Sequence, residues 1–262
     1  MKRTLIVPNM DEIHPLFHSF MKNAPVYDSS CSPFAKVWYI EKDGGYYLKK
    51  SDKVTLEKEA SLTKYFSEKG LSAKVLSYIS EESDWMLTER VGGEDCTFSK
   101  YLEYPEKLCD TLAELLKSLH GMKADDCPVS NRTADYLAGA EKNYREGMFD
   151  PSYCMPDLRP QSADEAWKIV SEKKHLLKAD TLLHGDYCLP NVLLDEDWRF
   201  SGFIDLGGAG VGDKHIDLYW GAWTLSFNLK TDKYRNRFFD VYGRDEVDEE
   251  LISLIGVIES FG

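Results

Sequence analysis

The segment TLLHGDYCLPNVLLDEDWRFSGFID, residues 181–205, restricts the possible folds of this chain more than any other. Its apolar runs are short, so TLLHGD and NVLLD are predicted to form brief strands, and FSGFIDL a strand that pairs back after a turn at EDW. Asp186 and Asn191, five positions apart, then flank a loop, and Asp205 ends the returning strand.

Three oxygen-bearing side chains are thereby expected to converge at one end of these strands. Carboxylate and amide oxygens suit Mg²⁺, which keeps several waters and takes one or two carboxylates together with substrate phosphates. A carboxylate that does not bind the metal can orient an attacking hydroxyl. Phosphoryl transfer needs such positioning and charge neutralisation more than it needs covalent chemistry, so the spacing indicates a phosphotransferase.

Two residues upstream strengthen this interpretation. Lys49 lies in the predicted strand YYLKK, and Glu59 lies in the predicted helix LEKEA. A loop Asp followed five positions later by Asn, then a D-x-G, with a strand Lys and a helix Glu upstream, is the signature of protein kinases. Each feature alone is common, but the four occur here in the kinase order and on the expected types of element.

The rest of the chain predicts an α+β fold with two lobes. A short helix is expected near 10–20, an antiparallel meander across 24–50, a helix at 55–70, and two strands joined by an acidic turn within 73–93. The glycine pair at 92–93 marks a boundary between a nucleotide-binding lobe with its hinge, 1–92, and a helical lobe that carries the catalytic loop and substrate site, 93–262.

In the second lobe, an apolar stripe predicts a helix at 108–122, and prolines are expected to break 125–180 into short helices and loops. The glycine-rich run GGAGVGD is expected to loop into a helix at 215–227. Trp220 and Trp223 are expected in the core of the C-terminal helices.

Composition excludes several classes of partner. The net charge is −13, from 45 acids against 32 bases, which disfavours nucleic acid and anionic membranes and attracts cationic ligands. No stretch approaches the roughly 18 apolar residues of a membrane span, and the first apolar run is too short for a signal peptide. Six cysteines without a C-x-x-C pair favour free thiols in a reducing cytoplasm.

The whole chain resembles the aminoglycoside phosphotransferases, most closely the aminoglycoside 3′-phosphotransferases, a bacterial resistance family. HGDYCLPN matches the family's H-G-D-x-x-x-x-N, and SGFIDLGGAGVGDKHIDLYW matches its G-F-I-D-x-G…D-x-x-x-D run. SPFAKVW, YYLK, LEKE and MLTERVGG occur in family order. The resemblance implies a protein-kinase-like fold, with an antiparallel β-sheet in the N-terminal lobe and a mainly helical C-terminal lobe.

By position, the resemblance implies roles for the central residues. Asp186 would be the catalytic base or the group that orients the substrate hydroxyl. Asn191 and Asp205 would bind Mg²⁺, while Lys49, paired with Glu59, would hold the α and β phosphates of the nucleotide.

Further nucleotide contacts are implied in the first lobe. Tyr47 would stack on adenine, although its strand position suits a core residue equally well. Leu87, Thr88 and Arg90 belong to the hinge whose backbone would bind the edge of the base. Ser32 would lie in the turn that covers the phosphates, with Ser30 as the alternative because the loop is one residue longer than expected.

The acceptor side departs from the family pattern. Members usually carry an arginine soon after the D-x-G, where this chain has Gly208. They also tend to end in two adjacent carboxylates that contact ammonium groups of the drug, whereas VIESFG offers only Glu259. The acid-rich insertion is milder and includes Asp157. Asp186, Glu259 and Asp157 are the predicted acceptor contacts.

We therefore expect an aminoglycoside kinase that uses ATP or GTP with Mg²⁺, favours a 3′-hydroxyl and confers resistance, as a monomer or weak dimer. One alternative keeps the fold with another acceptor, such as a choline-like alcohol, a sugar or a macrolide. A second alternative is a nucleotide-binding protein without turnover, which the intact Lys49, Glu59, Asp186, Asn191 and Asp205 disfavour.

Overall fold

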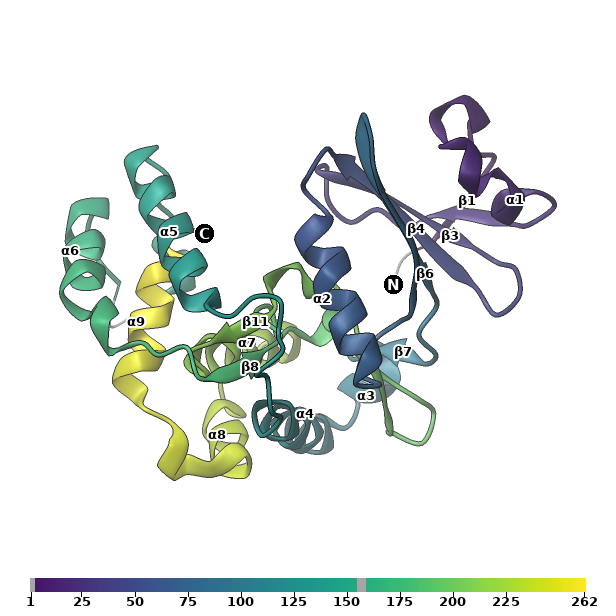
Figure 1. The fold of residues 1–262 in the computed structure, drawn as a ribbon. Coiled ribbons are helices and arrows are strands. Elements are labelled where there is room, and N and C mark those ends of the chain that lie inside the picture. Colours follow the sequence, from purple (N-terminus) through teal and green to yellow (C-terminus); the bar gives the residue numbers. More distant parts are fainter. Residues whose placement is uncertain (1–2, 155–158) are drawn as a thin grey trace. The chain divides into compact units, whose positions relative to one another are not determined.

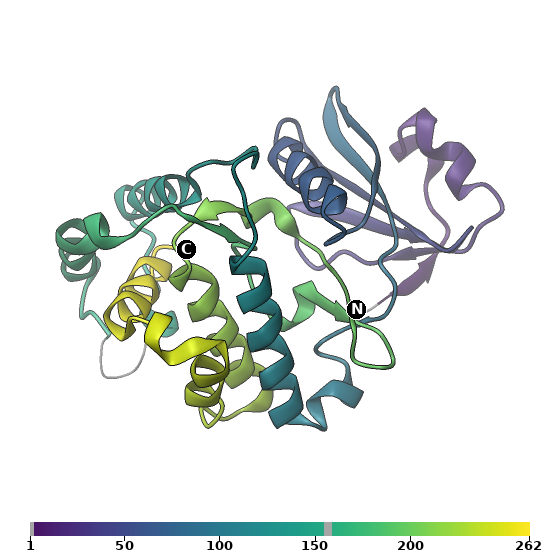
Figure 2. The ribbon, with the colours of Figure 1, turned by 60° about the horizontal axis from the view of Figure 1, so that its bottom comes forward.

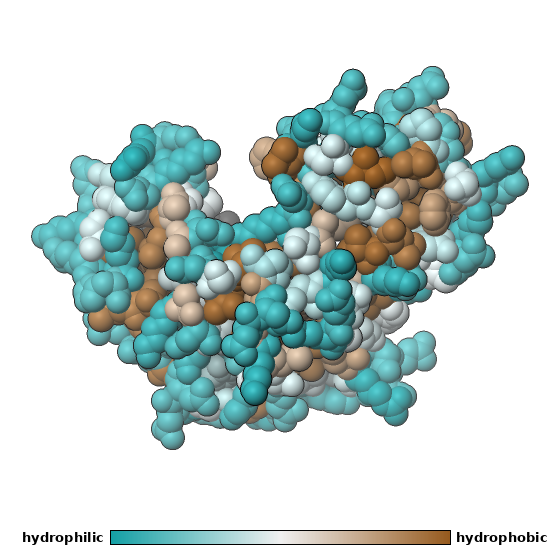
Figure 3. Space-filling model, in the orientation of Figure 1, coloured by the Kyte–Doolittle hydropathy of each residue, from teal (hydrophilic) through white to brown (hydrophobic). Residues whose placement is uncertain are grey.

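The computed structural model of this chain describes residues 3–154 and 159–262. The chain divides into two compact units. Unit 1 comprises Met1–Asp95 and Pro190–Gly207, and unit 2 comprises Cys96–Leu189 and Gly208–Gly262. None of the helices within the described ranges combines the length and the apolar character that crossing a bilayer requires. Hydrophilic side chains cover most of the face shown in Figure 3, with scattered apolar patches between them.

Unit 1 is built on a six-stranded antiparallel sheet in the order β1-β2-β3-β4-β6-β5 (Figure 1). The strands are β1 (Thr4–Ile6), β2 (Val26–Asp28), β3 (Ala35–Ile40), β4 (Tyr46–Asp52), β5 (Val75–Ser80) and β6 (Ser83–Glu89). This topology confirms both the expected meander and the two later strands joined by an acidic turn.

Alternation along β4 sorts its side chains between the two faces of the sheet. Leu48 is fully buried in an apolar cluster that includes Trp85. Lys49 therefore points to the opposite face. The helix α2 (Glu57–Glu68) packs on that face, where Ala60 joins a second apolar cluster. The helix expected in this region is confirmed, and one face of it lies near Lys49.

The single helix expected near 10–20 is wrong. Three short elements stand in its place, η1 (Met10–Glu12), η2 (Pro15–Phe17) and α1 (His18–Met21). Pro15 lacks a backbone N–H and disfavours a helical conformation in the preceding residue. His14 accordingly has an extended backbone with ψ of 133°, so the helical pattern breaks there.

A second, three-stranded sheet completes unit 1. Its strands are β7 (Glu94–Asp95), β9 (Val192–Leu194) and β10 (Phe200–Phe203), in the order β10-β9-β7. The β9–β10 hairpin confirms that FSGFIDL pairs back on NVLLD. The N–H of Phe203 donates to the carbonyl of Leu71 at 2.7 Å, which ties β10 to the segment after α2.

Unit 2 is mainly helical (Figures 1 and 2). Its helices are α3 (Ser99–Leu102), α4 (Pro105–His120), α5 (Arg132–Arg145), α6 (Ala163–Lys173), α7 (His215–Leu229), α8 (Arg235–Gly243) and α9 (Glu249–Glu259). Its two strands, β8 (Thr181–Leu183) and β11 (Gly210–Gly212), pair antiparallel. Within the described residues, the other short helical turns are η3 (Pro151–Tyr153), η5 (Lys174–Leu176), η6 (Leu189–Asn191), η7 (Leu206–Gly208) and η8 (Arg244–Glu246).

Two predictions for unit 2 need correction. The region 125–180 holds the 14-residue helix α5, which begins where the side chain of Asn131 accepts a hydrogen bond from the N–H of Ala134. The glycine-rich run before α7 is not all loop, since β11 lies within it. Glycine has a low strand propensity, and pairing with β8 overrides it. The helices expected at 108–122 and 215–227 are confirmed as α4 and α7.

Candidate active site

Unit 1 contains a cavity of about 360 Å³ on the α2 face of its sheet. Its walls come from β3, β4, β6, α2, β10 and the serine-rich loop before β3. The predicted nucleotide contacts that line it are Ser32, Tyr47, Lys49, Glu59 and Thr88, and the predicted metal ligand Asp205 lines it as well. The fold thus gathers residues that lie as far apart as 32 and 205 in the sequence.

A partly buried ion pair lines this cavity. The Nζ of Lys49 donates to both Oε1 and Oε2 of Glu59 at 2.8 Å, and to Oδ1 of Asp205 at 3.2 Å. Burial alone would lower the pKa of Lys49, but the carboxylates of Asp205 and Glu59 outweigh it and raise the pKa. Lys49 is therefore a fixed positive charge in the cavity.

Asp205 stands on an unusual backbone. Its φ is 56°, a left-handed conformation that non-glycine residues rarely adopt and that is often found at functional sites. The N–H of Ile204, the preceding residue, donates to the carbonyl of Asn191 at 3.1 Å. That hydrogen bond holds the backbone of Asn191 next to the residue that precedes Asp205. Asn191 itself is buried and is not among the residues that line the cavity.

The side-chain oxygens of Asn191 and Asp205 are of the types that bind Mg²⁺. Asn191 offers an amide oxygen and Asp205 a carboxylate whose side chain is 58% exposed, and hard oxygen ligands are what this cation prefers. The described residues contain no cluster of three or more His, Cys, Asp or Glu that would hold a metal by itself. A cation at this pair would therefore need oxygens from water or a ligand as well.

The remaining predicted nucleotide contacts are arranged as follows. The hydroxyl of Tyr47 accepts a hydrogen bond from Arg3 Nη2 at 2.6 Å. Leu87 is fully buried in the apolar cluster on the other face of the sheet, and the N–H of Arg90 donates to the carbonyl of Gly45. Neither residue lines the cavity, whereas Val91, which the sequence did not single out, does.

The two serines of the loop before β3 differ in position. Ser32 lines the cavity, and its hydroxyl accepts a hydrogen bond from the N–H of Phe34 at 3.1 Å. The hydroxyl of Ser30 accepts from the N–H of Val37 at 3.0 Å and lies outside the residues that line the cavity. The geometry favours Ser32 over Ser30 as the residue that faces a ligand.

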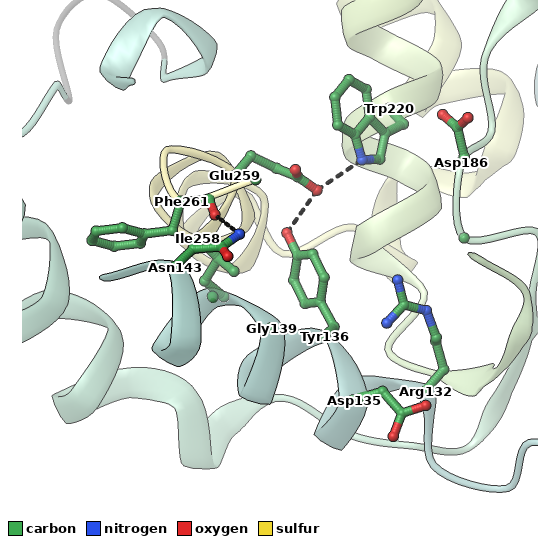
Figure 4. A pocket seen from close by; sticks show the side chains of 13 residues that line it. Arg132, Asp135, Tyr136, Gly139, Asn143, Asp186, Trp220, Ile258, Glu259 and Phe261 are labelled. Carbon is green, nitrogen blue, oxygen red and sulfur yellow. Dashed lines mark hydrogen bonds between the residues drawn. The ribbon is translucent and has the colours of Figure 1, made fainter. Parts of the chain in front are cut away.

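Unit 2 contains a second cavity, of about 280 Å³, around Asp186 (Figure 4). Polar and charged groups in its wall come from α5, α7, α9 and the loop after β8. They are Arg132, Asp135, Tyr136, Asn143, Asp186, Trp220 and Glu259. Asp157, the other predicted acceptor contact, lies outside the described residues.

The loop that carries Asp186 is fixed by hydrogen bonds from its own backbone. The N–H groups of His184 and Gly185 donate to Oδ2 and Oδ1 of Asp217 in α7, each at 2.7 Å. The N–H of Leu189 donates to Oγ1 of Thr224, which lies about two turns after Asp217 in α7. His184 Nδ1 accepts a hydrogen bond from the N–H of Asp186 at 3.3 Å, which gives the imidazole a structural role in this loop.

Close backbone packing adds a steric constraint beside Asp186. Gly185 has φ of 80°, and a Cβ at this position would lie 1.8 Å from the carbonyl oxygen of Gly208. Only glycine fits there. The carbonyl of Gly208 also accepts a hydrogen bond from Arg132 Nε at 2.7 Å.

Glu259 is held deep in the wall of this cavity. Its Oε1 accepts hydrogen bonds from Tyr136 Oη and Trp220 Nε1, both at 2.8 Å (Figure 4). Burial, reinforced by the charge of Asp186, raises the pKa of Glu259 to about 7, although both hydrogen bonds oppose the shift. At neutral pH the carboxyl is therefore only partly ionised.

Sequence reasoning missed four polar residues of this cavity, Arg132, Asp135, Tyr136 and Asn143, and misplaced a fifth, Trp220. Arg132, Asp135 and Tyr136 lie in the first two turns of α5, in a region expected to be broken into short pieces. Asn131, a residue type that favours the N-cap position, was the signal in the sequence that a helix begins there. Trp220 was expected in the core, but it is only partly buried and donates to Glu259 at the cavity wall.

Comparison with known proteins places this chain in a family. Residues 34–251 match the model of the phosphotransferase enzyme family called APH. The chain belongs to this family, which is a class of enzymes that transfer phosphoryl groups.

Individual relatives agree with that assignment. The chain is 47% identical over 255 residues to a probable aminoglycoside 3′-phosphotransferase of Lactococcus lactis, with 97% of each chain covered. It is 31% identical over 172 residues to an aminoglycoside 3′-phosphotransferase of Niallia circulans, with 64% of each covered.

Solved structures confirm the fold class. The crystal structure of an aminoglycoside 3′-phosphotransferase of type VIII has a TM-score of 0.72 and 23% identity, covering 99% of this chain and 94% of that one. APH(3'')-Id from Streptomyces rimosus has a TM-score of 0.74 and 21% identity, covering 88% and 91%. The expected α+β, protein-kinase-like fold is confirmed.

Proposed function

We propose that this protein is an aminoglycoside kinase that transfers the γ-phosphoryl group of ATP or GTP to a hydroxyl of the antibiotic, with the 3′-hydroxyl favoured, and so confers resistance. The observation that carries the proposal is the 47% identity to the Lactococcus lactis protein over nearly the whole of both chains. The cavities around Lys49 and Asp186 supply the chemistry that such a reaction needs.

The nucleotide binds in the cavity of unit 1 in this proposal. Lys49, held by Glu59, contacts the α and β phosphates, since its ammonium is the positive charge fixed there. Tyr47 and Thr88 contact the base, and Ser32 lies towards the phosphates. The relatives offer support, because APH(3'')-Id has been solved with ADP and streptomycin, and an APH(4)-Ia variant with AMP-PNP and hygromycin B.

Asn191 and Asp205 would hold Mg²⁺. Held there, the ion would supply positive charge that offsets the charge on the phosphates. Asp205 Oδ1 accepts a hydrogen bond from Lys49 Nζ at 3.2 Å, which supports a place for its carboxylate beside the phosphates in this proposal.

The acceptor binds in the cavity of unit 2. Asp186 accepts the proton of the attacking hydroxyl, and the hydrogen bonds from His184 and Gly185 to Asp217 keep its loop in one conformation. Asp135, on the exposed side of the cavity, and the net charge of −13 both favour a polycationic acceptor. The wall of the cavity combines these acids with the aromatic faces of Tyr136 and Trp220.

A related kinase with another small acceptor, such as a choline-like alcohol, a sugar or a macrolide, is the second candidate. One observation favours it. The Oε1 of Glu259 already accepts two internal hydrogen bonds, and the raised pKa leaves this carboxyl partly neutral near pH 7. It is therefore a weaker partner for an ammonium group than an exposed carboxylate.

The test is a coupled assay of nucleoside diphosphate release with Mg²⁺, ATP or GTP, and a panel of kanamycin, neomycin, a macrolide, choline and simple sugars. Turnover with kanamycin, but not with an analogue that lacks the 3′-hydroxyl, would support the proposal. Turnover with another acceptor alone would select the second candidate. The variant Asp186→Asn should lose most of the rate; equal rates would remove the assigned base, and no turnover with nucleotide still bound would point to a non-catalytic protein.

The expected cytoplasmic location and the monomeric or weakly dimeric state stay predictions. Size-exclusion chromatography with light scattering would measure the second of these directly.

A further inference from the structure

The cavity around Asp186 contains a guanidinium group, that of Arg132 in the first turn of α5. Its Nε donates to the carbonyl of Gly208 at 2.7 Å, which fixes the plane of the group. Among the described residues, no carboxylate forms an ion pair with Arg132. The two Nη groups therefore keep their capacity to donate hydrogen bonds to a ligand. In the view of Figure 4 the guanidinium stands between Tyr136 and the segment that carries Asp186.

The start of α5 is held rigidly, so the position of this guanidinium is well defined. The hydroxyl of Thr133, the next residue, donates to the carbonyl of Lys178 at 2.7 Å and accepts from the N–H of Asp213 at 2.8 Å. The glycines of β11 pack against Arg132, since a Cβ at Gly210 or Gly212 would lie 3.1 or 3.3 Å from Arg132 Cβ. The glycine strand thus brings the helix start close to the catalytic loop.

A positive charge here opposes the binding of a cationic acceptor. Like charges in a partly desolvated cavity repel more strongly than they do in water. If the cavity served only to bind an aminoglycoside, Arg132 would weaken that binding. Its charge acts on Glu259, whose pKa it lowers against the effect of burial, and an anion that comes within reach during the reaction gives its Nη groups a ligand.

The proposed reaction supplies such an anion. The acceptor hydroxyl held by Asp186 forms the new bond to phosphorus, so the non-bridging oxygens of the phosphoryl group must come within a few ångströms of that hydroxyl. Planar guanidinium groups bind two phosphoryl oxygens at once, and cations at this position stabilise the charge of the transition state.

We propose that Arg132 is a catalytic residue that binds the non-bridging oxygens of the transferred phosphoryl group, both in the transition state and in the phosphorylated product, through its two Nη groups. The inference rests on the proposed function and adds a residue to it. In this step the acceptor oxygen bonds to the γ-phosphorus while the bond to the β–γ bridging oxygen breaks. The electron pair of the broken bond stays on the nucleoside diphosphate, and the hydroxyl proton passes to Asp186. Arg132 makes and breaks no covalent bond.

This role predicts opposite effects on the two forms of the acceptor. Replacing Arg132 by methionine removes the contact to the phosphate ester and also removes the repulsion of the ammonium groups. Affinity for the phosphorylated product should fall at least about tenfold, because hydrogen bonds between charged groups are stronger than those between neutral groups. Affinity for the unphosphorylated acceptor should stay the same or rise. If Arg132 only supported the loop at Gly208, its replacement would weaken the binding of both the acceptor and the phosphorylated product.

The experiment uses phosphorylated kanamycin prepared with the parent enzyme. Calorimetric titration then measures the affinity of parent, Arg132→Met and Arg132→Lys for kanamycin and for the product. We expect kcat to fall about 100-fold in Arg132→Met, with KM for kanamycin within about threefold. The matched control is Arg145→Met, since Arg145 lies on the same helix, is exposed and pairs with Glu141.

Equal losses of affinity for both ligands, or no loss for either, would overturn the assignment of Arg132. If Arg132→Met does not fold, Arg132→Lys decides, because its single ammonium should weaken product binding without weakening kanamycin binding. If the parent makes no phosphorylated kanamycin, the proposed function fails on its own. Inorganic phosphate then becomes the probe. Binding to the parent that Arg132→Met loses would support the inference, and binding that is absent or unchanged would refute it.

Discussion

The Nζ of Lys49 lies 2.8 Å from both carboxylate oxygens of Glu59 in the cavity of unit 1. The two side chains are only 20% and 12% exposed, so solvent and salt screen this pair less than they screen a surface ion pair. Lys49 is thus oriented before a nucleotide arrives. The cost of fixing a flexible ammonium group is met during folding and not during binding.

Replacing Glu59 by glutamine should therefore weaken nucleotide binding. The amide keeps the shape but loses the charge that holds Lys49, so KM for the nucleotide should rise and kcat should fall, each by about tenfold, with little change in the KM for the acceptor. Steady-state kinetics at varied ATP measure this. Glu57→Gln, an exposed position in the same helical turn, is the control. Similar kinetics in both variants would contradict the assigned role of Glu59.

Asp217 should be a positioning residue for the catalytic loop. Its two carboxylate oxygens accept from the N–H groups of His184 and Gly185, and it is fully buried. In Asp217→Asn the amide nitrogen would face an N–H donor, which should cost roughly 1–3 kcal/mol of stability. We also expect kcat to fall about 100-fold, because a small displacement of the base slows transfer strongly.

Thermal unfolding and kcat measured on the same sample test this. The exposed Asp240→Asn should match the parent in both. An Asp217→Asn protein with lowered stability but unchanged kcat would show that the loop does not depend on these two hydrogen bonds.

Local pattern was enough to predict the parts of the site that depend on one element. Alternation in β4 places Lys49 opposite the buried Leu48, and helical spacing places Glu59 in α2, so their pairing follows from neighbouring elements. The hairpin that leads from Asn191 to Asp205 is likewise local. These features could be predicted from the sequence because each depends on periodicity within about twenty residues.

The acceptor cavity was harder to predict from the sequence because it depends on long-range contacts. Tyr136 and Glu259 are 123 positions apart, and Arg132 and Gly208 are 76 positions apart. Nothing in the sequence near either residue encodes such pairings. The same holds for β8 and β11, whose pairing places a glycine strand against the start of α5.

Asp84 should control the start of α2, and through it the position of Glu59. Its Oδ1 accepts from the N–H of Val54 at 2.9 Å, and its Oδ2 from the N–H of Leu56 at 2.8 Å. Ser80 and Tyr78 hydroxyls also donate to it. Although burial opposes ionisation, these hydrogen bonds keep the pKa of Asp84 below its ordinary value.

Asp84→Asn should lower the free energy of unfolding at pH 7 by roughly 1–3 kcal/mol, because backbone donors lose a charged acceptor. Urea unfolding monitored by circular dichroism measures the change, and the exposed Asp52→Asn is the control. The loss should shrink as the pH falls towards the pKa of Asp84, where the parent also loses its charge. A loss that is independent of pH would argue against the ionised form as the stabilising one.

Glu259 predicts a pH dependence of stability with a definite sign. Its pKa is about 7 in the folded protein against an ordinary value of 4.5. Below pH 4.5 both states hold the proton, so the group has no effect. Between pH 4.5 and about 7 only the unfolded chain releases it, so the free energy of unfolding falls, and above pH 7 the loss stays constant.

Glu259→Gln keeps an oxygen acceptor for Tyr136 and Trp220 but cannot ionise. The difference between the free energies of unfolding of this variant and the parent should therefore be about 3 kcal/mol more favourable to the variant at alkaline pH than at acidic pH. Urea unfolding of both proteins at either end of this range measures the gain, and a difference that does not change with pH would show that Glu259 ionises normally.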